Sequence, residues 1–276
     1  MDTSLYNLKI ISSGGNRLEI YKVSRYAIRT QGESNNKEGR RGKDTISEVQ
    51  KEENTKKSRK TNLTNTRNNI IRLIKSNDDM KTFLTLTFQE EVDYKQSKKL
   101  LNNLFTKLRK KYLGLKYLWV LEFGTKNNRL HYHLLTNIPL PGQVNFAKTR
   151  EKKSQEHKDF ENKFRSEYWK YGFVDIRDLD QEGNNNIALY VSCYIVKDLL
   201  DKQLEGYRIY GYSMKTLNKP TTSKLYDNRG IEEVIRDFEK DYDIKHTNSY
   251  EIGYTDYRGE HKGITTYFDL EKKNNS

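Results

Sequence analysis

Apolar residues along positions 82–204 recur with the spacings of strands and helices in alternation. Residues 82–88 read TFLTLTF, in which Leu84, Leu86 and Phe88 alternate with threonines and predict a strand. Residues 93–112 carry leucines and aromatic residues at helical spacing with lysines between them, which predicts an amphipathic helix. The further predicted elements are strands at 117–124 and 129–136, a helix at 145–170, a strand at 172–179 and a helix at 187–204.

The order of these elements predicts the fold class. Strand, helix, strand, strand, helix, strand is the split βαβ order of ferredoxin-like and RRM-like domains, in which an antiparallel sheet carries helices on one face. We therefore expect an α+β protein with small N- and C-terminal appendages. The second face of the sheet is expected to be open and free to carry a site.

Composition divides the chain into four segments. Residues 1–28 alternate around a Gly-rich turn and predict an N-terminal β-hairpin. Residues 29–66 are almost wholly polar and bury too little apolar surface to offset ordering entropy, so we expect a linker or a disordered arm. Residues 67–205 hold the split βαβ core, and residues 206–276 predict a C-terminal α/β appendage with a helix at 231–242.

Charge and cysteine content narrow the class of protein. The chain has 51 Lys and Arg against 38 Asp and Glu, a net charge of +13, which favours a polyanionic partner, most simply nucleic acid. The basic stretch at 40–60 is the best candidate for nonspecific phosphate contact. A mean hydropathy of −1.00 and the lack of a long apolar run predict no membrane span. Cys193 alone cannot form a disulfide scaffold or a multi-cysteine zinc site, and this favours a reducing cytoplasm.

The strands at 117–124 and 129–136 carry candidate metal ligands. A four-residue turn between them, with the apolar residues kept on one face, places Glu122 opposite His131 and Val120 opposite His133. Facing Cβ atoms lie about 4.5–5.5 Å apart. Two imidazoles and a carboxylate on adjacent rungs can bind one divalent ion with positions left for a phosphate oxygen. The alternative is that both histidines are ordinary surface residues of an open sheet.

The helix at 187–204 carries a second group of reactive side chains. Tyr190, Tyr194 and Lys197 lie at i, i+4 and i+7, within one stripe of the helix. A phenol is a poor nucleophile at its usual pKa near 10, and a nearby ammonium or metal favours the phenolate. Because the chain has 20 tyrosines, simple packing of these side chains is the alternative.

Together these segments resemble the three motifs of HUH endonucleases, specifically the rolling-circle replication initiators of phages and plasmids. The segments are TFLTLTF at 82–88, RLHYHLL at 129–135 and YVSCYIVK at 190–197, in that order. The histidine, bulky hydrophobic, histidine signature is matched by His131, Tyr132 and His133. The third segment is similar to the two-tyrosine form of its motif. Under this resemblance, residues 67–205 are the HUH endonuclease catalytic domain.

The resemblance implies a metal-dependent DNA endonuclease and strand transferase. Mn²⁺ or Mg²⁺ held by His131 and His133 polarises the scissile phosphate of single-stranded origin DNA. Tyr194 attacks it, which leaves a 5′-phosphotyrosine link and a free 3′-hydroxyl that primes synthesis. Tyr190 is the second nucleophile, and Lys197 orients the metal or the phosphate. The assignment of Glu122 as third ligand comes from the strand register described above.

The resemblance also implies partners and a location. No phosphate-cradling loop is found in the chain, so a host helicase and a host DNA polymerase are expected partners in the bacterial cytoplasm. Two other functions remain open. One is a related HUH transposase or relaxase, and the other is a catalytically inactive protein that binds single-stranded DNA or regulates its own synthesis.

Overall fold

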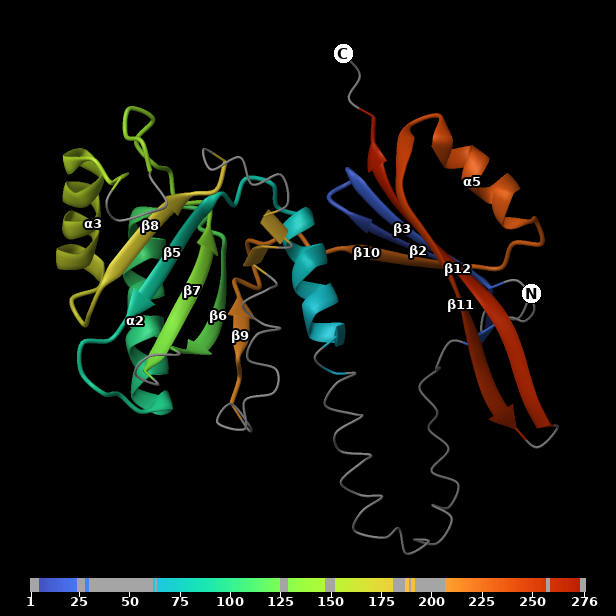
Figure 1. Cartoon of the computed structure of the whole chain (residues 1–276), viewed down its shortest axis with the longest axis horizontal. Coiled ribbons are helices and arrows are strands. Elements are labelled where there is room, and N and C mark those ends of the chain that lie inside the picture. The colour runs from blue at the N-terminus through green and yellow to red at the C-terminus, as the bar shows by residue number, and fades with distance from the viewer. Residues whose placement is uncertain are drawn as a thin grey trace, which may run out of the picture. The chain divides into compact units, whose positions relative to one another are not determined.

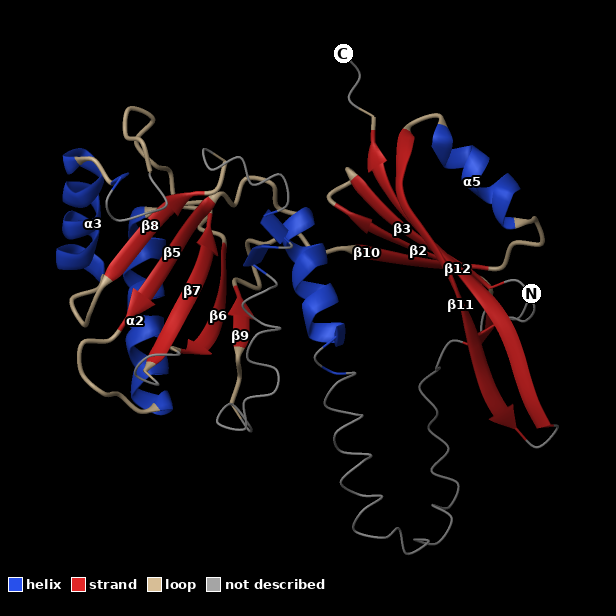
Figure 2. Ribbon diagram, in the orientation of Figure 1, coloured by secondary structure: helices blue, strands red, loops and turns tan. Residues whose placement is uncertain are grey.

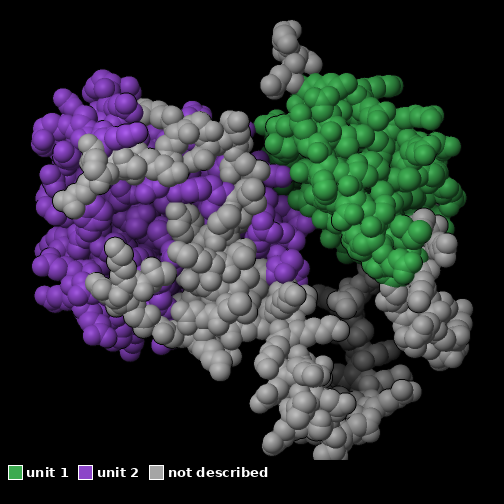
Figure 3. Space-filling view, in the orientation of Figure 1, with its two compact units in different colours: residues 1–55, 219–276 green, residues 56–218 purple. Residues whose placement is uncertain are grey.

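A computed structural model describes most of the chain as two compact units, coloured separately in Figure 3. We call residues 56–218 the core unit, and residues 1–55 with 219–276 the terminal unit. The residues that the structure describes are 5–23, 28–29, 62, 64–124, 129–146, 152–180, 187–188, 190–191, 207–256 and 259–273.

The core unit contains an antiparallel five-stranded sheet in the order β8-β5-β7-β6-β9. Its first four strands in chain order, with two helices between them, form the split βαβ arrangement, so the predicted α+β fold class is confirmed (Figure 1). The fifth strand, which the sequence placed in the C-terminal appendage, pairs with the edge strand β6. The elements are β5 (Thr82–Thr87), α2 (Tyr94–Lys111), β6 (Tyr117–Phe123), β7 (Leu130–Thr136), α3 (Gln155–Tyr168), β8 (Val174–Asp178) and β9 (Tyr210–Tyr212).

Both long helices of the core unit begin at a capping side chain. The carboxylate of Asp93 accepts a hydrogen bond from the Gln96 backbone N–H at 2.7 Å at the start of α2. The hydroxyl of Ser154 accepts one from the His157 N–H at 3.2 Å at the start of α3. This cap explains why α3 begins later than the predicted helix at 145–170. Phe146, counted as part of that helix, instead packs into the core from the segment before it.

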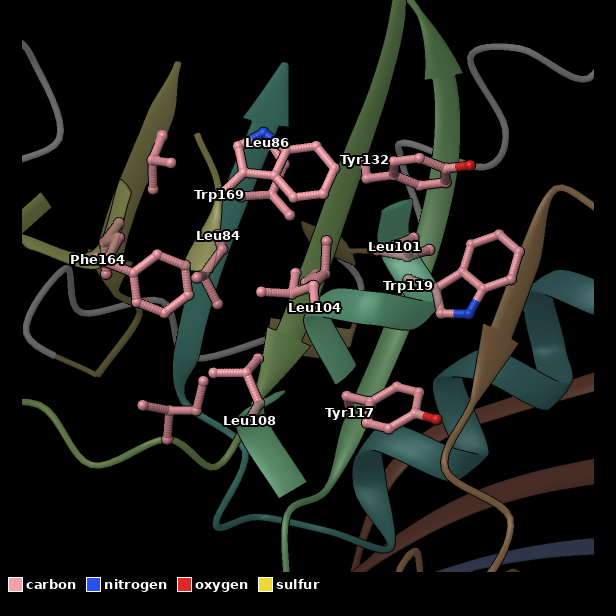
Figure 4. Packing of buried hydrophobic residues seen from close by; sticks show 14 of the residues in the cluster. Leu84, Leu86, Leu101, Leu104, Leu108, Tyr117, Trp119, Tyr132, Phe164 and Trp169 are labelled. Atoms are coloured by element: carbon pink, nitrogen blue, oxygen red, sulfur yellow. The ribbon is translucent and has the colours of Figure 1, made fainter. Parts of the chain in front are cut away.

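Helices α2 and α3 cover one face of the sheet, and the main core lies between them (Figure 4). Leucines from α2 interlock with the apolar rungs of the strands, and the fully buried indole of Trp169 closes one side. The contributing side chains that Figure 4 labels are Leu84, Leu86, Leu101, Leu104, Leu108, Tyr117, Trp119, Tyr132, Phe164 and Trp169.

The second face of the sheet is covered, so the prediction of an open face is wrong. Residues 64–75 form a helix. Its side chains, with those of residues 187–191, pack against the strands, where Ile70 and Phe83 are fully buried and Val120 nearly so. The helix carries isoleucines and leucines at helical spacing, and the burial of this apolar surface stabilises it against the sheet. Side chains of the predicted site therefore lie in a protected environment.

The terminal unit is a second five-stranded sheet, in the order β10-β2-β3-β12-β11, with α5 packed on it (Figure 2). The predicted N-terminal hairpin is present, and positive φ angles of 65° and 76° at Gly14 and Gly15 form its turn. Strand β3 of this hairpin pairs with β12, so segments that the sequence assigned to separate N- and C-terminal appendages share one sheet. Its elements are β1 (Leu5–Tyr6), β2 (Leu8–Ser13), β3 (Arg17–Val23), β4 (Ile28–Arg29), β10 (Thr221–Leu225), α5 (Ile231–Glu239), β11 (Tyr242–Asp256) and β12 (Gly259–Lys272).

Helix α5 supplies the core of the terminal unit. Val234 and Ile235 pack on Ile20 and Leu270 from the sheet, and all four are nearly or fully buried. Within the described ranges, no helix combines the length and apolar character that crossing a bilayer requires.

Candidate active site

The register of the central hairpin matches the prediction. Glu122 lies opposite His131, and Val120 lies opposite His133. Strand β5 completes both rungs, with Thr87 opposite His131 and Thr85 opposite His133. The register follows from the apolar residues on the other face, because a slip by one residue would turn those residues away from the helices.

Glu122 and His133 form a buried pair. The Nε2 atom of His133 lies 2.6 Å from Oε2 of Glu122, and both side chains are less than a tenth exposed. The Nδ1 atom of the same ring lies 3.2 Å from the Thr85 hydroxyl. The ring of Phe83 stacks on the imidazole with centroids 5.7 Å apart. His133 is thus held in one orientation by a carboxylate, a hydroxyl and an aromatic face.

His131 is half-buried at the open end of the same hairpin. Burial lowers the pKa of its imidazole, the neighbouring His133 and Arg129 lower it further, and Glu122 opposes them. The neutral form, which is the form that ligates metals, is therefore favoured at neutral pH. Gly124 gives the ring its space, because a Cβ at that position would lie 2.5 Å from Cε1 of His131.

The donor set fits a divalent cation in its chemistry. Two imidazoles and a carboxylate lie on adjacent rungs, and two of their donor atoms already converge on one hydrogen-bond position. Among the residues that the structure describes, no group of three or more His, Cys, Asp or Glu side chains is arranged to hold a metal. Metal binding would therefore require Glu122 and His133 to exchange their mutual hydrogen bond for bonds to the ion.

Tyr190 lies on the same face of the sheet as the histidines. Its hydroxyl oxygen accepts a hydrogen bond from Arg177 at 3.1 Å. Its ring packs edge-on against Phe83 with centroids 5.5 Å apart, so Tyr190 and His133 contact the same phenyl ring. Tyr194 and Lys197 lie outside the described residues, and their approach to the histidines stays a prediction.

A buried ion network that the sequence reasoning missed supports Arg177. The Lys153 ammonium lies 2.6 Å from Glu161 and 2.6 Å from Asp175. Asp175 in turn accepts from Nε of Arg177 at 2.9 Å, which links the network to the Tyr190 hydroxyl. The signal in the sequence was the alternation of Asp175 and Arg177 on β8, which places both side chains on the face that carries the histidines.

The comparisons with known proteins concern the same part of the chain. Residues 81–199 match a family model described as a replication-associated protein of the ORF2 type. The matched segment spans strands β5 to β8 and includes Glu122, both hairpin histidines and Tyr190. No curated protein and no solved structure was found to match the chain. The family match indicates a replication-associated protein.

Proposed function

We propose that this protein initiates rolling-circle replication by nicking and rejoining single-stranded origin DNA through a 5′-phosphotyrosine intermediate, with the help of Mn²⁺ or Mg²⁺. The observation that carries the proposal is the paired placement of Glu122, His131 and His133 on one hairpin, inside the segment that matches the replication-associated protein family. Surface exposure does not account for this arrangement, because Glu122 and His133 are buried and bonded to each other.

In this proposal the metal is held by His131, His133 and Glu122. When bound there, it polarises a non-bridging oxygen of the scissile phosphate and offsets the charge that builds in the transition state. Thr85 holds Nδ1 of His133, which leaves Nε2 directed toward Glu122 and the ion. The lowered pKa of His131 removes the competition of a proton for the ligand nitrogen.

The covalent step is assigned to Tyr194. Its hydroxyl oxygen attacks phosphorus, the bond from phosphorus to the 3′-oxygen breaks, and the DNA 5′-phosphate becomes linked to the tyrosine. The phenol proton leaves to solvent and the departing 3′-oxygen takes up a proton, which gives the 3′-hydroxyl that a host polymerase extends. Lys197, three residues further along the proposed helix, stabilises the negative charge on the phosphate.

Tyr190 is assigned as the second nucleophile, which cleaves again after one round of synthesis and closes the displaced strand. Its hydroxyl is held by Arg177 through the Asp175 and Lys153 network. A side chain that only filled space would need no such support at its hydroxyl, and this arrangement favours a chemical role for Tyr190.

The test is an adduct assay with single-stranded oligonucleotides that tile the replication origin. We expect a denaturant-stable protein–DNA adduct in the presence of Mn²⁺, its loss in EDTA, and its loss in His131→Ala. Tyr194→Phe is expected to abolish or strongly reduce the adduct. The matched controls, His246→Ala and Tyr226→Phe, change the same residue types in the terminal unit and are expected to leave adduct formation unchanged.

An undiminished adduct in a Tyr190→Phe, Tyr194→Phe double variant would show that the nucleophile is wrongly assigned. Metal-independent, noncovalent binding with no adduct in any condition would contradict the enzyme and identify a binding or regulatory protein instead.

A further inference from the structure

A small pocket opens beside the candidate active site, on the opposite face of the same strands. Its volume is about 210 Å³, smaller than the roughly 300–1,000 Å³ of sites that take drug-sized ligands. Its floor is apolar, with Phe88 and Leu130 nearly buried and Phe123 half-buried. The size and floor suit one flat aromatic ring.

The pocket is tied to the site by strand geometry. Phe123 pairs with Leu130 on the rung next to the pair of Glu122 and His131. Because successive side chains on a strand point to opposite faces, these two apolar residues line the pocket while the adjacent polar pair faces the proposed metal. A strand of DNA that crosses this end of the hairpin can therefore present a phosphate to one face and a base to the other.

One wall of the pocket is an aromatic stack. The rings of Tyr94 and Tyr207 are nearly parallel, with an interplanar angle of 13° and centroids 4.3 Å apart. The Tyr94 hydroxyl accepts from the Arg208 backbone N–H at 3.1 Å, which fixes the Tyr207 segment against α2. Tyr207 remains 43% exposed. Stacking on aromatic side chains is the usual way in which proteins hold unpaired bases.

The rim of the pocket carries both signs of charge. Glu90, Glu91 and Asp93 supply carboxylates, and Asp93 already caps α2. Arg129 lies on the rim and donates one hydrogen bond to the Gln89 carbonyl at 2.9 Å, which positions its guanidinium. The rim therefore offers acceptors and donors to a ring bound within it.

Guanine is the base whose edges match this rim. It presents two donors, N1–H and the N2 amino group, on one edge and two acceptors, O6 and N7, on another. A carboxylate from Glu90 or Glu91 can accept from the donor edge, and Arg129 can donate to the acceptor edge. Adenine and cytosine lack a ring N–H beside their amino group, and thymine has no amino group. We propose that this pocket binds one unpaired guanine of the single-stranded DNA substrate, an inference that rests on the proposed function.

The experiment measures binding of the full chain to labelled oligonucleotides by fluorescence anisotropy in EDTA, so that neither metal nor covalent chemistry contributes. The probe is an oligothymidylate with a single central guanine, compared with the same strand carrying thymine, inosine or 7-deazaguanine there. We expect guanine to bind about tenfold more tightly than thymine, and both analogues to lose most of this preference. Inosine lacks the N2 amino group and 7-deazaguanine lacks N7.

Variants pair each protein group with the base atom it contacts. In Glu90→Gln with Glu91→Gln, replacing guanine by inosine is expected to cost little, whereas Glu232→Gln with Glu233→Gln on α5 keeps the full wild-type penalty. In Arg129→Gln, the penalty for 7-deazaguanine is expected to disappear.

The outcomes separate this inference from the proposed function. Equal affinity for the guanine and thymine strands, or an inosine penalty that the Glu90 and Glu91 substitutions leave intact, overturns the guanine pocket, even where Mn²⁺-dependent adducts still form. If none of the oligonucleotides binds and no adduct forms, both fail.

Discussion

The substitution Lys153→Met tests whether the buried ion network supports the core unit. It keeps the length of the side chain and removes its charge. The Lys153 side chain is 3% exposed, and its ammonium lies 2.6 Å from both Glu161 and Asp175, which are 9% and 13% exposed. Removal of one partner from a buried ion pair costs about 3–5 kcal/mol, because the remaining charge is left desolvated. Here two carboxylates would be left, so we expect a loss of unfolding free energy in this range.

The assay is urea unfolding followed by tryptophan fluorescence. The chain has two tryptophans, and Trp119 and Trp169 both lie buried in the core unit, so the signal reports that unit alone. With a urea dependence of about 2 kcal/mol per molar, the midpoint is expected to fall by about 2 M. Since single domains are stable by about 5–15 kcal/mol, the variant keeps only a small margin.

Two controls isolate the electrostatic cause. Lys158→Met on the exposed surface of α3 is expected to shift the midpoint by less than about 0.3 M, the scale of ordinary surface changes. Adding Glu161→Gln to Lys153→Met removes one stranded carboxylate and is expected to restore part of the loss. A midpoint for Lys153→Met within about 0.5 M of wild type would refute the argument, as would a double variant less stable than the single one.

Three further predictions concern the site and its surroundings. Gly124→Ala places a Cβ against the His131 ring, so Mn²⁺-dependent adduct formation is expected to fall by up to about 100-fold with little change in the urea midpoint; unchanged adduct rates would contradict the role of this contact. Lys98, half-buried 3.4 Å from the centre of the Trp119 ring, has its pKa lowered to about 8 from 10.5, chiefly by burial, so the folded state binds fewer protons than the unfolded state between these values and stability rises with pH there. Urea midpoints of wild type relative to Lys98→Met should accordingly increase from pH 8 to 10, and a flat or falling difference would contradict this. Tyr190→Phe is expected to keep the first covalent adduct and to lose strand rejoining, which product analysis on a denaturing gel would detect; full rejoining would show that Tyr190 only packs.

Local patterns were enough to predict the core of the fold and the register of its central hairpin. Alternation in β5, β6 and β7 determined which face each side chain takes, and the apolar face then set the rung that joins Glu122 to His131. The diagonal hydrogen bond from Glu122 to His133 did not follow from register, because side-chain rotamers decide it. The sequence therefore indicated the residues of the site better than their contacts.

Features that depend on distant segments were missed. Strand β10 reads TTSKL and is exposed throughout, so no hydrophobic pattern indicated it; pairing with β2 supplies its hydrogen bonds. The burial of the second sheet face depends on residues 64–75, which pack there only once the sheet exists. Lys153 gave no signal of its own, because its partners Glu161 and Asp175 come from later elements.

The central claim is that a tyrosine of the segment after β8 becomes bonded to DNA at a phosphate held by the hairpin histidines. The most direct test is to form the adduct with Mn²⁺ and origin-strand oligonucleotides, digest protein and DNA, and locate the nucleotide-bearing peptide by mass spectrometry. The account predicts a 5′-phosphate ester on Tyr194, with Tyr190 modified when Tyr194 is replaced by phenylalanine. A nucleotide on a residue outside 190–194, or an adduct that persists in His131→Ala, would contradict it.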